Sequence, residues 1–338
     1  MTNRFSGVGN GNSELERALN SLVSLSNLPM IGNVYVAMLS SDPGYVDFMK
    51  NYQVRYSDGT YRIHNTIASA YNAMTTDRHD LLLVNGYGAF AQTSMLTISN
   101  SRCHFASMDF MRGGNYGMGA SSKITMGVTT NATDLGVLKN TGVRNTFSGI
   151  KFDSANTKAE SIYGLVEAGE YAIYEGCEFY KSTDLDVSLS AEVLNNGDST
   201  QWNKCSFGSS ANETVGAVIR PCMLLTATIA GAKCRDNIAK DCNFLTKSAN
   251  SARVDVYGAN ATDVERMFKF KDCTFYSNPL GSATPAHAVG FGSAQTEGCV
   301  ILEDCTSIDH TVMAQASKGI YVQGSVPTFA TTGVSVAA

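Results

Sequence analysis

The sequence has little charge and no long hydrophobic run, and both absences narrow its possible partners. Charged residues make up 16% of the 338 residues, against about a quarter in an average soluble domain, and the net charge is -5. Lys and Arg form no run, so we expect no nucleic acid partner. No stretch reaches the roughly 18 apolar residues that span a bilayer, so we expect no membrane insertion.

The chain also lacks a recognisable signal peptide and any closely paired cysteines. Residues 1–12 are rich in Gly, Asn and Ser and contain no apolar core of roughly 7 to 15 residues. The nine cysteines are an odd number and none is in a Cys-x-x-Cys arrangement, so we expect reduced thiols in a protein made in a cytosol. The five histidines occur singly, so we expect no zinc site and no cofactor.

What the sequence does contain is a six-residue pattern that recurs along the chain. Its clearest form is Phe270-Lys-Asp-Cys-Thr-Phe275: an apolar residue, two polar or small residues, Cys, one polar residue and Phe. Related segments occupy 105–110, 147–152, 174–179, 202–207, 239–244 and 302–307. From the second copy onward the last position advances by 27, 28, 37, 31 and 32 residues, along 152, 179, 207, 244, 275 and 307. This period is typical of stacked-repeat proteins.

Stacking explains the residue types in the pattern. Equivalent residues of successive coils lie about 4.7 to 4.9 Å apart, so like residues stack on like residues. We expect the first apolar residue, the Cys and the Phe to point inward, and the two residues after the first to form a bend. The predicted core rows are Cys177, Cys205, Cys242, Cys273 and Cys305, and Phe152, Phe179, Phe207, Phe244 and Phe275. A metal or redox array of these thiols is disfavoured, because no His accompanies them.

The chain divides into four predicted regions. These are a flexible arm at 1–12, an N-terminal helix and capping region at 13–79, the repeat region at 80–325 and a tail at 326–338. In the capping region, Ser13 and Glu16 form a capping box before an amphipathic helical pattern that ends by Pro29. A strand at 34–39, a hairpin turning at Asp58-Gly59 and a short helix at 66–74 follow.

A second apolar track accompanies the six-residue pattern, so each coil has at least two strands. Its members are 187–189, 217–219, 254–256, 289–291 and 320–322. Together these segments resemble right-handed parallel β-helix proteins of the pectate-lyase-like kind, over roughly residues 80–325. The resemblance implies an all-β fold with a single right-handed parallel β-helix, closed by an N-terminal helix and hairpin cap. That group includes polysaccharide lyases and hydrolases, adhesins, and phage tailspikes, head fibres and capsid-decorating proteins, of which many virion forms are trimers.

An enzyme of this group would need carboxylates grouped on an exposed face, as acid and base or as calcium ligands beside an Arg. The Asn-Thr-Asp, Gly-His-Gly and Arg-Ile-Lys signatures expected of polygalacturonase-like members are absent. The nearest candidates for lyase-like chemistry are Asp184, Asp186, Arg220, Arg253 and Asp255. A solvated polar face explains these residues equally well. The densest titratable patch, 77–80, stands where Asp and His commonly bond exposed backbone, so we interpret it as capping.

Three functions therefore remain open. The first is a virion structural protein of a bacteriophage, a capsid decoration, cement or fibre protein. It would be a homotrimer, assembled in the host cytoplasm, that binds other virion proteins such as the major capsid protein. The second is a carbohydrate-active lyase or depolymerase of the tailspike kind. The third is a carbohydrate-binding adhesin, and in the last two cases the partner would be a host surface polysaccharide. The sequence favours the first, because it contains no recognisable active site.

Overall fold

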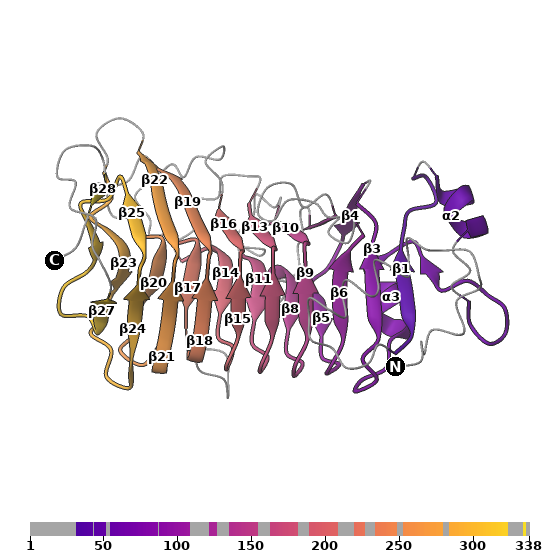
Figure 1. Ribbon diagram of the computed structural model, residues 1–338, viewed down its shortest axis with the longest axis horizontal. Coiled ribbons are helices and arrows are strands. Elements are labelled where there is room, and N and C mark those ends of the chain that lie inside the picture. Colours follow the sequence, from indigo (N-terminus) through magenta and orange to yellow (C-terminus); the bar gives the residue numbers. More distant parts are fainter. Residues whose placement is uncertain are drawn as a thin grey trace.

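The chain winds into a rod of stacked coils, each built from three short strands (Figure 1). This computed structural model describes residues 32–42, 44–51, 55–86, 88–108, 122–126, 135–154, 163–181, 189–208, 220–226, 234–248, 253–279, 284–323 and 334–335. The 24 strands from β3 to β26 occur in sets of three, one strand for each of three sheets, which gives eight coils. No helix among the described residues is long and apolar enough to cross a membrane.

Sheet 1 has eleven strands, all parallel. In spatial order they are β2 (Ile63–His64), β1 (Val34–Ala37), β3 (Leu81–Val84), β6 (His104–Ser107), β9 (Thr146–Ser148), β12 (Ile173–Glu175), β15 (Gln201–Asn203), β18 (Cys234–Lys240), β21 (Val264–Lys271), β24 (Gly298–Glu303) and β27 (Ile320–Gln323). The sheet therefore continues through β1 and β2, which precede residue 80 in the sequence.

Sheets 2 and 3 complete each coil. Sheet 2 contains β4 (Ala89–Gln92), β7 (Lys123–Met126), β10 (Lys151–Ser154), β13 (Glu178–Tyr180), β16 (Ser206–Gly208), β19 (Asn243–Ser248), β22 (Thr274–Pro279), β25 (Thr306–Ile308) and the antiparallel β28 (Val334–Ser335). Sheet 3 contains β5 (Leu96–Ile98), β8 (Gly136–Asn140), β11 (Tyr163–Glu167), β14 (Ala191–Asn195), β17 (Met223–Leu225), β20 (Val256–Gly258), β23 (His287–Phe291) and β26 (Val312–Ala314).

The recurring six-residue pattern forms the corner between sheets 1 and 2. Each of the six copies from 147–152 onward ends a strand of sheet 1, bends over two residues and then begins a strand of sheet 2, as β21 and β22 do. The bend residue has a positive φ, between 52° and 64°, in six successive coils: Gly149, Gly176, Lys204, Asp241, Asp272 and Asp304. Gly adopts this left-handed conformation freely, and Asp does so more readily than most residues, which explains why these types recur.

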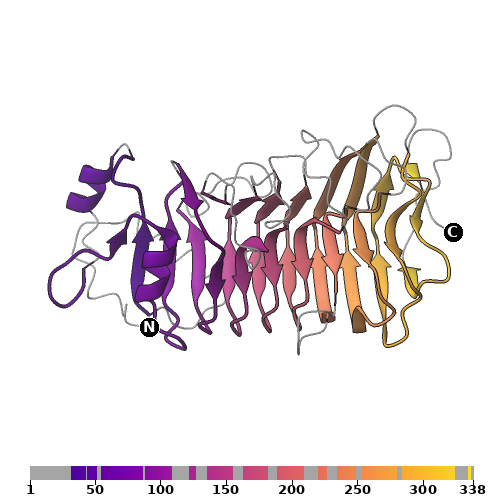
Figure 2. The ribbon, with the colours of Figure 1, turned by 180° about the vertical axis from the view of Figure 1, so that it is seen from behind.

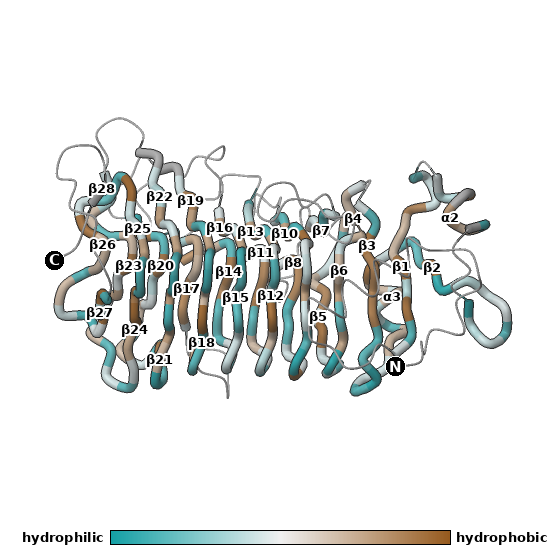
Figure 3. The backbone as a smooth tube through the Cα atoms, viewed as in Figure 1, coloured by the Kyte–Doolittle hydropathy of each residue, from teal (hydrophilic) through white to brown (hydrophobic). Residues whose placement is uncertain are grey.

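The interior at this corner consists of rows of stacked side chains. The structure buries all five cysteines and all five phenylalanines of the predicted rows. Phe207 stacks on Phe179 at 5.2 Å and on Phe244 at 4.6 Å between ring centroids. Each thiol of the cysteine row lies 3.3–3.5 Å from a backbone carbonyl oxygen in the preceding coil of sheet 1, as Cys205 Sγ does from Tyr174 O. Figure 3 shows the alternation of hydrophobic strand segments and hydrophilic turns along the rod.

One short helix packs against the coil interior near the N-terminal end of the rod. Helix α3 (Ile67–Ala73) starts after Thr66, whose hydroxyl accepts a hydrogen bond from the Ser69 amide, and it lies beside β1 (Figures 1 and 2). Its Ile67, Ala70 and Tyr71 belong to the same hydrophobic cluster as the coil interior. The short helix predicted at 66–74 is thus present, while the arm at 1–12 and the helix predicted from Ser13 lie outside the described residues.

Two smaller elements lie near this end. Helix α2 (Tyr45–Asn51) places Phe48 against the apolar outer face of sheet 1, in a cluster with Leu81 and Leu83. The predicted hairpin is present as an antiparallel bridge between Arg55 and Tyr61, and Gly59 at its turn has a φ of 86°.

Candidate functional site

Three of the five candidate residues for chemistry lie at the corner between sheets 2 and 3. Arg220 precedes β17, and Arg253 and Asp255 precede β20. The pairing of Met223 with Val256 places them on neighbouring coils, as the sequence suggested. They are not on an exposed or solvated face, however: 3%, 3% and 0% of their surfaces are accessible. The expected position on the outside of the rod is therefore wrong for these three, and Asp184 and Asp186 lie outside the described residues.

Further charged side chains share this corner. Lys181 follows β13 and Glu192 lies in β14, and both are buried. Glu192, Cys222 and Asp255 occupy one row, because the Val193 amide donates to Cys222 O and the Met223 amide donates to Asp255 O, each at 3.0 Å. We call the buried polar residues of this region the polar corner. They are Lys181, Ser190, Glu192, Arg220, Thr246, Arg253, Asp255, Ser277 and His310.

The electrostatics of the polar corner are those of a closed charge cluster. Burial raises the pKa of Glu192, and the nearby Arg220 and Arg253 oppose that rise. Burial and the nearby Arg220 lower the pKa of Lys181 to about 7, although Glu192 opposes both effects. Buried charges of this kind are tolerated only when they are compensated, so the residues of the cluster depend on one another. None of them is placed to meet a polysaccharide outside the coil.

One trio in this region has the connectivity of a catalytic triad. His310 Nδ1 lies 3.0 Å from Ser307 Oγ, and His310 Nε2 lies 3.1 Å from Asp255 Oδ2. Ser307 occupies the position next to Phe275 in the core row of sheet 2, and it is fully buried. A nucleophile must reach its substrate, so this serine is a core residue and not a catalytic one.

A buried carboxylate that the sequence analysis missed lies at the corner between sheets 3 and 1. Glu167 is fully buried and shares a row with Asn140 and Asn195. Its carboxylate accepts hydrogen bonds from the hydroxyl of Tyr174, from Asn140 Nδ2 and, at 2.6 Å, from the Gly169 amide. Burial raises the pKa of Glu167 to about 7, although these hydrogen bonds oppose the rise. The network closes on itself and leaves the carboxylate no path to solvent.

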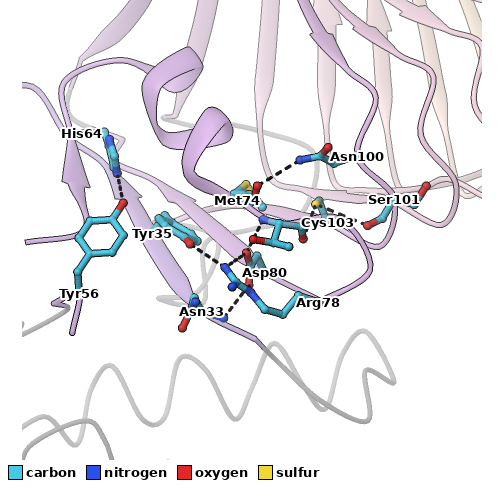
Figure 4. Close-up of polar contacts among 11 residues, drawn as sticks. Asn33, Tyr35, Tyr56, His64, Met74, Arg78, Asp80, Asn100, Ser101 and Cys103 are labelled. Carbon is cyan, nitrogen blue, oxygen red and sulfur yellow. Dashed lines mark hydrogen bonds and ion pairs between the residues drawn. The ribbon is translucent and has the colours of Figure 1, made fainter. Parts of the chain in front are cut away.

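The patch at 77–80 bonds backbone, as the capping interpretation predicts (Figure 4). Asp80 Oδ1 accepts from the Asn33 amide and Oδ2 from the Thr75 amide, both at 2.8 Å, and Arg78 pairs with the same carboxylate at 2.6 Å. Next to it, His79 and His104 stack with their rings 5.3 Å apart. Burial, with His79 nearby, lowers the pKa of His104 to about 4.

Metal binding finds no support in the described part of the chain. There, no group of three or more His, Cys, Asp or Glu side chains could hold a metal ion. Within the cysteine row, burial raises the pKa of the Cys205 thiol well above its usual value, which keeps that thiol in its unreactive protonated form.

Comparison with known proteins identifies the architecture. No protein-family model and no curated protein matches the sequence. Among solved structures, pectin methylesterase PemA from Erwinia chrysanthemi matches with a TM-score of 0.52 and 10% identity, over 92% of this chain and 94% of that chain. The fold is a right-handed parallel β-helix. Pectate lyase Pel9A matches this β-helix with a TM-score of 0.53 and 10% identity, over 91% of this chain and 78% of its own.

A third structure extends the comparison. The deglycosylated pectin methylesterase from Aspergillus niger has a TM-score of 0.51 and 12% identity, over 84% of this chain and 88% of that one. At such identities the likeness establishes the β-helix and its pectate-lyase-like architecture, and no more.

Proposed function

We propose that this β-helix is a structural protein of a bacteriophage virion, a capsid decoration, cement or fibre protein that acts by assembly. Two observations support a role without catalysis. Three of the five charged residues that were candidates for chemistry, Arg220, Arg253 and Asp255, are buried in the polar corner. The one Ser-His-Asp arrangement that we find in the described chain is buried as well.

The observation that carries the proposal is the C-terminal end of sheet 1, which no described strand covers. Leu302 in β24 is fully buried, but Val322, which pairs with it in β27, is 36% exposed. The neighbouring Tyr321 is 59% exposed. Strand β27 is the last strand of the sheet, lies at the C-terminal end of the rod (Figure 1), and carries no charge that would discourage pairing. A solenoid end of this kind needs a cover.

Self-association is the cover that we propose. The adjacent end of sheet 2 is already covered by β28, which pairs antiparallel with β25. Sheet 1 has no such strand among the described residues. Our expectation is a homotrimer that uses this end and binds other virion proteins, such as the major capsid protein. Its location would be the virion, after assembly in the host cytoplasm.

The experiment that tests the virion role is a mass-spectrometric inventory of phage particles purified from the host that produces this protein. We expect the chain to be present in the particles at a copy number divisible by three. We also expect it to migrate with the particles in a density gradient. Its recovery only in the unassembled fraction would refute the virion role.

A second candidate is binding or cleavage of a polysaccharide, favoured by one observation. The solved structures reported above are pectin methylesterases and a pectate lyase. The test is release of unsaturated sugar products from host polysaccharide, with and without calcium. Activity that is lost in Arg220→Gln, assayed at a temperature at which circular dichroism shows the variant to be folded, would establish the enzyme. Retention on the polysaccharide without products would instead indicate an adhesin.

A further inference from the structure

Several buried polar atoms of the polar corner have no hydrogen-bonding partner in the protein. They are Ser190 Oγ, Glu192 Oε2, Thr246 Oγ1, Asp255 Oδ1 and Ser277 Oγ. Each belongs to a residue that is at most 4% exposed. In native proteins such atoms are nearly always bonded, to protein or to ordered water. A gathering of them on one corner therefore points to an occupant.

The topology brings these atoms together. Thr246 and Ser277 are paired neighbours in sheet 2, on successive coils. Thr246 lies two residues before the end of β19, and Asp255 directly precedes β20, the next strand of the same coil, so the two residues lie on either side of this corner. Glu192 lies in the row of Asp255, with Cys222 between them. Both carboxylates contribute to raising the pKa of the Cys222 thiol, after burial, which places them near it from either side.

We propose that the polar corner binds a row of ordered water molecules inside the coil. The unpartnered atoms are carboxylate oxygens, which accept hydrogen bonds, and hydroxyls, which both accept and donate. Water satisfies both kinds at once. An anion would be repelled by Glu192 and Asp255, and a cation by Lys181, Arg220 and Arg253, so a neutral ligand fits this corner best.

The row explains how ionised side chains persist inside a narrow β-helix. Water bonded to the carboxyl groups of Glu192 and Asp255 offsets part of the free energy that their burial beside the two arginines costs. The inference is independent of the virion role, because it concerns the interior of the coil and not its ends.

The test combines a high-resolution crystal structure of the wild-type protein with the variant Thr246→Val. Water peaks within hydrogen-bonding distance of Thr246 Oγ1 and Asp255 Oδ1 are expected. Val keeps the shape of Thr but removes the hydroxyl, so in a hydrated corner it leaves the waters short of a partner. The unfolding equilibrium constant should then rise about ten-fold. Ser277→Ala provides a second variant with the same expected sign.

Thr274→Val is the matched control, since Thr274 lies on β22 at a half-buried position. This change should leave the unfolding equilibrium constant within about two-fold of the wild-type value. In a dry corner, deleting an unpartnered hydroxyl stabilises the fold. A crystal structure without water at these atoms, or a Thr246→Val protein more stable than the wild type, would overturn the proposal.

Discussion

Two corners of the same coil differ in the side chains that fill them: one is apolar and the other is charged. The corner between sheets 1 and 2 turns within two residues and is filled with stacked rings and thiols. The corner between sheets 2 and 3 encloses the charged side chains of lysine, arginine, glutamate and aspartate. The first corner has the same two-residue turn in six successive coils, whereas the side chains of the second differ from coil to coil. The comparison teaches that the β-helix needs only one uniform corner to keep its coils in register.

The largest expected effect comes from breaking the apolar corner at Phe207. This ring stacks between Phe179 and Phe244 and is fully buried, so Phe207→Ala leaves a cavity in the middle of the row. We expect the free energy of unfolding to fall by about 3 to 5 kcal/mol, measured by chemical denaturation. Leu245→Ala, at a half-buried position one residue after Phe244, is the control. A loss below about 1 kcal/mol for Phe207→Ala would contradict the stacked core.

A similar loss is expected from breaking the polar corner at Arg220. Arg220→Met removes a cation that lowers the pKa of the buried Glu192, and so leaves a carboxylate with less compensation. We expect a loss of about 3 kcal/mol at neutral pH, because uncompensated buried charge is strongly destabilising. The double variant Arg220→Met, Glu192→Gln should recover part of the loss. If the double variant is less stable than the single one, the two side chains do not compensate each other.

The third corner, between sheets 3 and 1, is expected to make the free energy of unfolding depend on pH, with an effect of intermediate size. The pKa of Glu167 is raised from 4.5 to about 7 in the folded chain, so its protonated form is favoured by folding. Its contribution to stability is fully present below pH 4.5 and is lost as the pH rises through about 7. We expect a loss of about 3 kcal/mol at most over that window, which Glu167→Gln should abolish.

Urea denaturation at several pH values between about 4 and 8 measures how the free energy of unfolding changes with pH. Glu303→Gln is an informative control of opposite sign, since hydrogen bonds from Lys269 and Lys271 lower the pKa of Glu303. Parallel pH profiles for wild type and Glu167→Gln would show that Glu167 is hydrated and not buried.

The smallest expected effect concerns the bends of the apolar corner. Asp272 has a φ of 53°, a conformation that Ala adopts at a cost of about 1 kcal/mol and Gly adopts freely. Asp272→Ala should therefore be less stable than Asp272→Gly by about that amount in thermal or chemical denaturation. The reverse order would mean that the bend is not held in the left-handed conformation.

The sequence predicts the apolar corner well because the same buried positions recur there in each copy. It predicts the polar corner poorly, since a thiol, Cys222, stands between the carboxylates Glu192 and Asp255 in the same row. The strands of sheet 3 also resist prediction: β14 begins at Ala191 and β17 at Met223, after the apolar segments at 187–189 and 217–219. Those segments lie outside the described residues, apart from Leu189.

A signal for the third corner was present in the sequence. Asn140, Glu167 and Asn195 are separated by 27 and 28 residues, from 140 to 167 and from 167 to 195, the same steps that separate Phe152, Phe179 and Phe207. A polar residue that keeps the period of the core indicates an inward row. Burial of Arg220, Arg253 and Asp255 carried no such signal, because charged residues are exposed in most proteins and only the coil geometry turns these inward.

Sedimentation velocity over a range of protein concentrations tests most directly whether this β-helix acts by assembly through its open end. We predict that the 36.1 kDa chain sediments as a trimer, that Tyr321→Lys in β27 shifts it to monomer, and that Tyr171→Lys, at a position 50% exposed on another part of the surface, leaves the trimer intact. A wild-type protein that remains monomeric at every concentration would contradict the account.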